Sequence, residues 1–350
     1  MSQTGVLPFV RGIDFTKYNF DDAVKHPKLL AEMQRLRWIR INNTGMKALP
    51  SEISALKKLV NLCFILLINP FYKLARIFEL KEQLHITHNS ITKLNKELIG
   101  LSCLRVLNAR HNRILSENVP NDLHNLEDLT VLDLSYNEMT DVPHNLEEAK
   151  SILVLNLGHN HITNIPNHLF INLTDLVFLD LSSNKLEMLP PQLRRLVHLK
   201  TLILNDNPLL HAQLRQLPAL VSLEALHLQN TQRTLTNIPQ GLENLPNLKE
   251  IDLSNNNLSI IPDTIYKIKT LRRLNYSQNS ISEVSHMFGD LDELITLNLS
   301  RNKLLSLPVS FFFNYRVFYK SLYPLKTDHI SKKLFFKIVK YINSDFRQFF

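Results

Sequence analysis

Leucines recur along the chain in a fixed alternation with polar residues. The repeated unit has an apolar residue at its first, fourth and sixth slots and Asn at its ninth, which is the pattern L-x-x-L-x-L-x-x-N. Nine successive copies begin at Leu104, Leu129, Ile152, Leu176, Leu199, Leu223, Leu248, Leu271 and Leu294, and the copy at Leu223 has Thr in place of Asn. From Asn89 to Asn302 the Asn slot recurs every 23 to 25 residues. Such even spacing indicates a stacked repeat array instead of one enlarged core.

The alternation within each copy predicts a short strand. Apolar residues at the fourth and sixth slots have polar neighbours, which is the period of a strand with one buried face. We expect strands one repeat apart to pair in parallel. The Asn is expected to be buried at the turn, where its amide satisfies backbone groups of its own and the next coil. Thr44 and Thr231 take this slot with only a hydroxyl, so we expect weaker rungs there.

Proline marks the end of several strands. Leu-Pro or Ile-Pro follows the Asn in several copies, as in Ile165-Pro166 and Leu189-Pro190. Proline ends strand pairing, so the chain should turn into a short helical or irregular return. The pattern therefore predicts an α/β repeat solenoid over residues 1–310, a leucine-rich-repeat horseshoe with a parallel inner sheet and short helical or irregular outer segments.

Two segments do not follow the repeat, residues 63–84 and 311–350, and both are rich in Phe, Ile, Tyr and Lys. Thr44 and Asn89 are 45 residues apart, about two repeats. We favour one degenerate extra coil within 63–84, with Phe64 and Ile86 in the core on neighbouring parallel strands. The alternative ejects this insertion as a loop. The extra coil is preferred because burying its apolar side chains outweighs a lost Asn rung.

Beyond the generic repeat, parts of the chain resemble one known family. The stretches MSQTGVLPFVRGIDF, LFINLTDLVFLDLSSNKLEMLPPQLRRLVHLKTL and LNDNPLLHAQLRQLPAL are similar to the repeat region of the flightless family, which are gelsolin-related actin regulators. The resemblance covers Met1 to Leu62 and His85 to Pro308, and Asn207 to Pro218 is its most specific part. It implies an N-terminal array that binds partner proteins, and actin binding through C-terminal gelsolin-like domains.

The chain departs from this family in two respects. None of its 350 residues resembles a gelsolin-like domain, so the resemblance links actin to a region that this sequence does not contain. The segments 63–84 and 311–350 match neither the family nor the repeat. We hypothesise that both are retained intron or mispredicted coding sequence. Spliced transcript reads that carry both segments would refute this hypothesis.

Net charge changes the picture only at the C-terminal end. The chain carries +8 at pH 7, but residues 311–350 alone hold eight Lys and Arg against two Asp. The array is nearly neutral, so we expect neither a nucleic-acid nor a membrane partner for it. The basic, Phe-rich tail keeps open an alternative function, in which the protein associates with membranes or nucleic acid through residues 311–350.

Cysteine content and the apolar runs bear on location. The chain has two cysteines, a start without signal-peptide features and no apolar run of about 20 residues. These features predict a reducing, intracellular location, in the cytoplasm and as a second option the nucleus.

Catalytic and metal-binding patterns are not found. The sequence has no Gly-rich phosphate loop, no C-x-x-C and no H-E-x-x-H. The pairs His85/His88 and His159/His161 could bind a metal, but outward slots on a strand explain His85, His88 and His159 better. Asp133 and its counterparts in later repeats form a polar row more readily than a catalytic pair. We therefore expect no cofactor, no metal and no enzyme.

Function is expected on the inner sheet face. Side chains at the third, fifth, seventh and eighth slots should point away from the core, and aromatic and Arg residues there are favoured binding anchors. The predicted protein-partner contacts are Trp38, Arg40, Arg110, His111, Asp133, Tyr136, His159, Phe178 and Asp180. We expect Tyr136 and Phe178 to be accessible, so that replacing them with Ala should weaken binding without changing thermal stability.

Overall fold

The computed structural model describes residues 12–17, 38–48, 83–102, 104–209, 214–305 and 308. The chain divides into two compact units, residues 1–199 and residues 200–350. The predicted tail, 311–350, lies outside the described residues, and so does all of the insertion except its last two residues.

The strands that the structure describes are three residues long and their pairs are parallel, as predicted, but those at Trp38–Arg40 and Gln83–His85 lie in separate sheets. In the first unit, β1 pairs with β2, and β3 to β7 pair in chain order. These strands are β1 (Gly12–Asp14), β2 (Trp38–Arg40), β3 (Gln83–His85), β4 (Val106–Asn108), β5 (Val131–Asp133), β6 (Val154–Asn156) and β7 (Phe178–Asp180). In the second unit, five strands also pair in chain order. They are β8 (Thr201–Ile203), β9 (Ala225–His227), β10 (Glu250–Asp252), β11 (Arg273–Asn275) and β12 (Thr296–Asn298).

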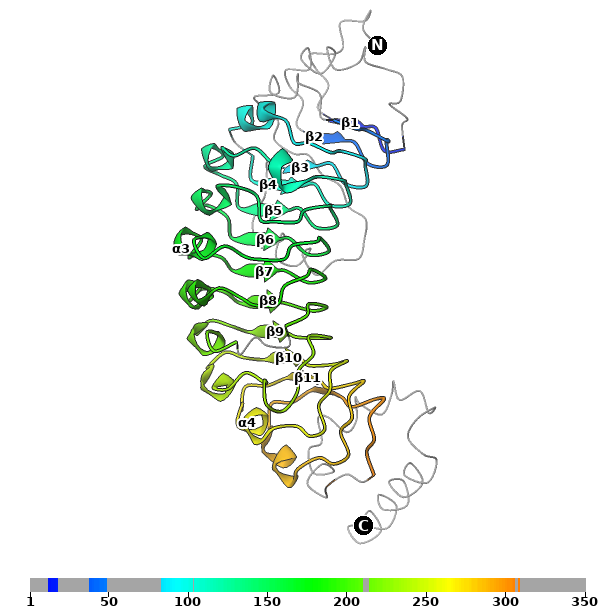
Figure 1. Ribbon diagram of the computed structural model, residues 1–350, viewed down its shortest axis with the longest axis vertical. Helices are drawn as coiled ribbons and strands as arrows, with labels where there is room; N and C mark the ends of the chain where they lie inside the picture. The colour runs from blue at the N-terminus through cyan, green and yellow to red at the C-terminus, as the bar shows by residue number, and fades with distance from the viewer. Residues whose placement is uncertain are drawn as a thin grey trace, which may run out of the picture. The chain divides into compact units, whose positions relative to one another are not determined.

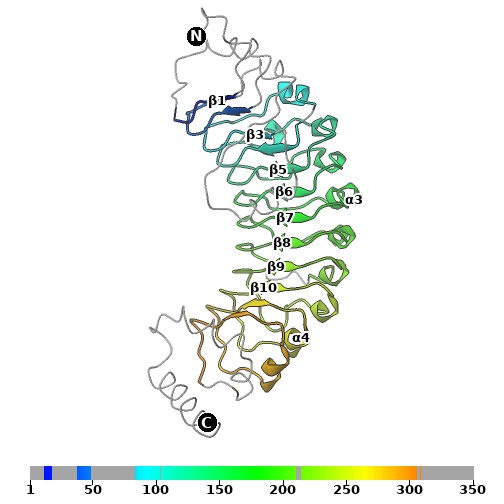
Figure 2. The same cartoon turned by 180° about the vertical axis from the view of Figure 1, so that it is seen from behind.

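Short helices form the return segments. In the first unit they are η3 (Lys96–Gly100), η4 (Ser116–Asn118), η5 (Leu123–Asn125), η6 (Leu146–Glu148), α3 (Leu169–Asn172) and η7 (Pro191–Arg195). In the second unit they are η8 (Leu217–Ala219), η9 (Leu242–Asn244), α4 (Asp263–Tyr266) and η10 (His286–Asp290). Within each unit the strands line one side and the helices the other (Figure 1), and the view from behind shows the same two layers (Figure 2).

The core lies between these layers. Leucines at the fourth slot pair in register along the sheet, as Leu107 does with Leu132, and both are fully buried. The return segments supply the other wall, for example Phe170 and Leu193, which are also fully buried. The burial pattern confirms that no coil completes its core alone, because each leucine packs against its counterparts in the adjacent coils.

The Asn ladder connects each coil to the one before it. The side-chain amide of Asn137 donates to the carbonyls of Leu134 (2.9 Å) and Ser135 (3.2 Å) in its own coil, and to Ala109 (3.1 Å) in the preceding coil. Its oxygen accepts from the amide of Ile114, also in the preceding coil (3.0 Å). The predicted role is confirmed, but its direction was wrong: we expected the next coil along the chain.

Thr231 forms a weaker rung, as predicted. Its hydroxyl donates to a single carbonyl, that of Leu228 (2.7 Å), where Asn137 reaches three. Arg233 bonds a different group of this turn: its Nε and Nη2 lie 3.3 Å from the carbonyl of Thr231 itself. Arg233 takes a slot that is apolar in the other coils, and its side chain is fully buried.

The predicted extra coil is contradicted by the contacts on either side of the insertion. The amide of Asn89 donates to the carbonyl of Ile41 (2.7 Å), and its oxygen accepts from the backbone of Thr44 (3.0 Å). Asn112 makes the corresponding contact with the carbonyl of Ile86 (2.7 Å) in its neighbouring coil. The coils of Thr44 and Asn89 are therefore direct neighbours, and no coil stands between them.

The reason for this outcome is chemical. An intervening coil would have placed Leu67 in the Asn slot, where it cannot supply a rung, whereas Asn89 bonds directly to the Thr44 coil. We gave too much weight to the apolar side chains of the insertion. Leu84 and Ile86 are buried in the slots that the motif assigns to them, so this repeat copy is confirmed. Phe64 lies outside the described residues.

Tyr276 occupies a sixth slot that holds Leu in most copies, and this gives a first prediction. Its side chain is fully buried, its hydroxyl has no hydrogen-bond partner among the described residues, and burial raises its pKa strongly. Removing an unsatisfied buried hydroxyl should be favourable, so Tyr276→Phe should raise the free energy of unfolding by about 1 kcal/mol. Urea unfolding followed by circular dichroism measures it.

Tyr266 provides the matched control in the same unit. Its hydroxyl accepts from the backbone amide of Ser285 (3.4 Å). Tyr266→Phe should therefore lower the free energy of unfolding by about 0.5–1.5 kcal/mol. A loss of stability in Tyr276→Phe as large as in Tyr266→Phe would contradict this account.

Candidate functional site

The sheet face of the first unit carries most of the residues that the sequence predicted as binding contacts. The sheet face of the first unit is defined as the side chains at the third, fifth, seventh and eighth slots of its coils. These side chains point away from the core, because side chains alternate along a strand. Arg110, His111, Tyr136 and Asp180 are partly exposed there, and His159 is exposed. Trp38 and Arg40 lie on β2, and their side chains are outside the described set.

Phe178 differs from its prediction. It takes the third slot of β7, but only 3% of its surface is exposed. It pairs in register with Val154 of β6, which is also 3% exposed. Neighbouring apolar side chains in the same slot cover each other across the strands. The expected accessibility of Phe178 was wrong, and we now expect Phe178→Ala to lower stability, because it removes a buried side chain.

Asp133 is also buried, at 4% exposure, and has a structural role. Its Oδ1 accepts from the backbone amide (3.0 Å) and the hydroxyl (2.6 Å) of Ser135, closing the turn after β5. Asp180 makes the same backbone contact with Ser182 (2.9 Å). Burial raises the pKa of Asp133. The polar row of fifth-slot side chains expected from the sequence therefore exists, and these two members stabilise turns.

The most distinctive feature of this face is a stack of four rings, one from each of four consecutive coils. We call His88, His111, Tyr136 and His159 the ring column. Its ring centroids are 4.2, 4.1 and 3.8 Å apart, and successive planes differ by 28°, 27° and 14°. These separations are shorter than the roughly 4.5–7 Å usual for aromatic pairs, so successive rings are in close stacked contact.

The backbone explains why the rings meet. All four residues hold the eighth slot and have left-handed φ angles of 54° or 55°. The amides of His88, His111 and Tyr136 each donate to a seventh-slot carbonyl of the following coil, at 3.1, 3.1 and 3.0 Å. The same turn in each coil thus projects its side chain in the same direction. The sequence reasoning missed the column, although the shared slot could have revealed it.

Arg110 joins the column from the seventh slot. Its guanidinium carbon lies 4.5 Å from the centre of the Tyr136 ring, within range for a cation–π interaction. Its Nε is buried and has no hydrogen-bond partner among the described residues. This environment lowers the pKa values of two histidines. The pKa of His111 is lowered to about 4, mainly by burial and further by the nearby charges of His88, Arg110 and His159. Burial and then Arg110 lower the pKa of His88.

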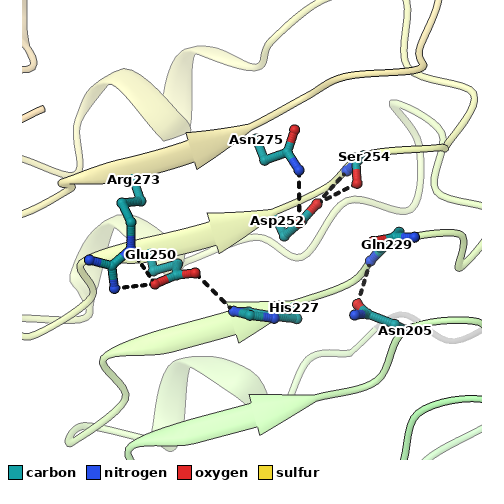
Figure 3. Close-up of polar contacts among 8 residues, drawn as sticks. All are labelled: Asn205, His227, Gln229, Glu250, Asp252, Ser254, Arg273 and Asn275. Carbon is teal, nitrogen blue, oxygen red and sulfur yellow. Dashed lines mark hydrogen bonds and ion pairs between the residues drawn. The ribbon is translucent and has the colours of Figure 1, made fainter. Parts of the chain in front are cut away.

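In the second unit, a network of charged and polar side chains connects β9, β10 and β11. Glu250 accepts from Nε2 of His227 (3.2 Å) and from Nε of Arg273 (2.5 Å), and Figure 3 shows these three residues on successive strands. The contact with His227, reinforced by Arg273, lowers the pKa of Glu250 to about 2. Further along the same strands, Asp252 bonds Ser254 and Asn275 (Figure 3).

The acidic side chains of this second network are paired with basic neighbours. The Glu250 carboxylate is flanked by a cation and an imidazole, and Glu224 is similarly flanked by Lys249 (2.7 Å) and Lys200 (3.5 Å). Charges that are already paired offer little net attraction to a charged partner. None of these residues was predicted as a site.

Two further observations limit the chemistry of the described residues. None of them form a group of three or more His, Cys, Asp or Glu side chains that could hold a metal ion. No helix within the described ranges has the length and apolar character of a membrane span.

The chain has the leucine-rich-repeat fold. A leucine-rich-repeat family model matches residues 150–209 and 221–281, and a second one matches 293–315. A solved leucine-rich-repeat protein of Leptospira interrogans is 27% identical, with a TM-score of 0.67 over 91% of this chain and 85% of that protein.

Its sequence is similar to the repeat portion of flightless-1 proteins. The protein flightless-1 homolog of Danio rerio is 50% identical over 259 residues, which cover 74% of this chain and 19% of that protein. The homolog of Homo sapiens is also 50% identical over 259 residues. The chain thus spans about a fifth of the length of these curated relatives. The resemblance to the flightless family expected from the sequence is confirmed.

Proposed function

We propose that the chain is a non-enzymatic protein-interaction module that binds a partner protein on the sheet face of its first unit. The observation that carries this proposal is the ring column with Arg110, a row of aromatic and cationic side chains held in one orientation by the backbone. Aromatic residues and Arg are the side chains most often found at the centre of protein interfaces.

The rest of the face supports the same function. Val131 and Asp180 are partly exposed on this face, so it has an apolar and a polar position within one sheet. It consists of short strands and offers rigid backbone, which lowers the entropy lost on binding. The two cysteines of the chain and the resemblance to flightless proteins support a cytoplasmic scaffold with a role linked to the actin cytoskeleton.

A pair of matched variants tests this proposal. Val131 is partly exposed in the third slot of β5, and Val197 is 39% exposed just after η7. A charge is compatible with the third slot, because Glu250 and Arg273 hold it in the second unit. Val131→Asp should reduce the capture of partner proteins from a cell extract at least about tenfold, a loss of about 1.4 kcal/mol.

Val197→Asp is the control and should capture partners as the unchanged chain does. Circular dichroism melts of both variants show whether the fold is retained. Equal capture by Val131→Asp, with an intact fold, would refute binding at this face.

A further inference from the structure

We propose that the ring column makes the partner-binding surface proton-sensitive: the stack holds while its imidazoles are neutral, and it opens when they take up protons. This inference rests on the proposed function, since the column lies along the same sheet face. It concerns how binding is regulated, and the proton response can be measured on the chain alone.

The short distances within the stack disfavour charged rings. Three of the four rings are imidazoles, and His88 and His111 are in direct contact at 4.2 Å between centroids. His111 and His159 lie on the two faces of Tyr136, at 4.1 and 3.8 Å. Two charged imidazoles at such distances repel each other, and burial reduces the screening of that repulsion by water.

Several other charged groups surround the column. Arg110 is a fixed positive charge over Tyr136, and it disfavours protonation of both His88 and His111. Asp133 is the nearby carboxyl group that interacts with Arg110, but its oxygen is bonded to Ser135. Three exposed titratable side chains each lie two residues after a member of the column, namely Arg113, Glu138 and His161.

Opening of the stack would also disturb hydrogen bonds between neighbouring coils. His88 has its Nδ1 buried without a hydrogen-bond partner among the described residues, so a proton there would have no acceptor. The eighth-slot backbone carries the hydrogen bonds to the next coil, for example from Tyr136 to Gly158 (3.0 Å). Displacing the rings would therefore disturb the same turn that positions Arg110 and Tyr136 for a partner.

The direction of the pH effect follows from the lowered pKa values. In an unfolded chain a histidine titrates near 6.5, whereas the folded pKa of His111 is about 4. The stabilising contribution of the neutral ring is complete above about pH 6.5, and it is lost as the pH falls from 6.5 towards 4. Partner binding by the folded chain should weaken only as the pH approaches 4, where His111 takes up a proton.

The test is an NMR titration of the whole chain from pH 7.5 to pH 4, with the imidazole C–H signals and the Tyr136 ring signals as readouts. We expect His111 to titrate near pH 4, and the Tyr136 signals to move with it. The variant His88→Phe/His111→Phe/His159→Phe keeps planar rings but cannot take up protons, so its Tyr136 signals should stay constant. His111→Phe alone should reduce the response and serves if the triple variant does not fold. His198→Phe changes an exposed histidine outside the column and should respond as the unchanged chain does.

Two results would overturn the proposal. The first is a Tyr136 environment that does not change down to pH 4 in the unchanged chain. The second is an equal change in the triple Phe variant, which would assign the response to carboxylates such as Asp133. Capture experiments form the second arm: partner capture by the unchanged chain should hold down to about pH 5 and fall about twofold at pH 4, where half of the His111 rings carry a proton, and the triple variant should lose much less.

The two arms separate this inference from the proposed function. A proton response in the column, together with undiminished capture by Val131→Asp, would refute binding at this face and leave the column as a structural pH sensor. Capture that depends on Val131 but not on pH would keep the proposed function and refute the regulation.

Discussion

Asn160→Ala should lower the free energy of unfolding by about 3 kcal/mol or more. The amide of Asn160 donates to the carbonyls of Leu134, Leu157 and Gly158 at 3.0 to 3.2 Å, and its oxygen accepts from the amide of Met139 (3.1 Å). Asn160 is only 4% exposed, so alanine would leave several buried backbone groups unsatisfied, each costing about 1–3 kcal/mol before relaxation. Urea unfolding provides the measurement.

Hydrogen exchange shows where this loss acts. In a stack in which each coil contacts only its neighbours, the faster exchange should be centred on the coils of Asn137 and Asn160. The matched control is Asn164→Ala, which removes an exposed amide from the same coil and should change stability by less than about 0.5 kcal/mol. Similar losses in the two variants would contradict the ladder as the connection between coils.

Arg233→Ala should destabilise the second unit by about 3–5 kcal/mol. The guanidinium is fully buried and donates to the carbonyls of Thr231 (3.3 Å) and Asn237 (3.0 Å). Its pKa is lowered by burial to about 10, so it is still charged at pH 7. Alanine removes these contacts and leaves a cavity.

Arg233→Met separates the contribution of volume from that of hydrogen bonding. The same slot is apolar in other coils, as with Leu258 and Ile281, and methionine adapts to irregular cavities. The free energy of unfolding of Arg233→Met should therefore be at least about 2 kcal/mol higher than that of Arg233→Ala. Arg215→Ala, at an exposed position of the same unit, should have an effect below about 0.5 kcal/mol. Equal losses in Arg233→Met and Arg233→Ala would show that hydrogen bonding dominates and that the cavity does not.

Strand positions and core residues could be predicted because both follow from one period. A leucine that alternates with polar neighbours must point into the core, and Leu132 and Leu155 are fully buried as expected. Period alone did not show how far neighbouring side chains cover each other. Phe178 points away from the core but is covered by its neighbours in the same slot, and Asp133 closes a turn.

Contacts between coils were the least predictable part. The ring column requires the left-handed turn at the eighth slot, which a pattern of apolar residues does not reveal. Arg233 could have been noticed from the sequence as the charged exception in an apolar slot. The insertion was misjudged because burial of its apolar residues was counted without asking which residue would form the rung. Asn89, bonded to the coil of Thr44, answers that question.

The most direct test of partner binding on the sheet face is site-specific photo-crosslinking. A benzophenone side chain is placed at Val131 on the sheet face or, as a control, at Val197 beyond η7, and each chain is irradiated in a cell extract. The account predicts discrete crosslinked products from Val131 that an excess of unlabelled chain abolishes, and few or none from Val197. Products from Val197 alone, or the same products from both positions, would contradict binding through the sheet face of the first unit.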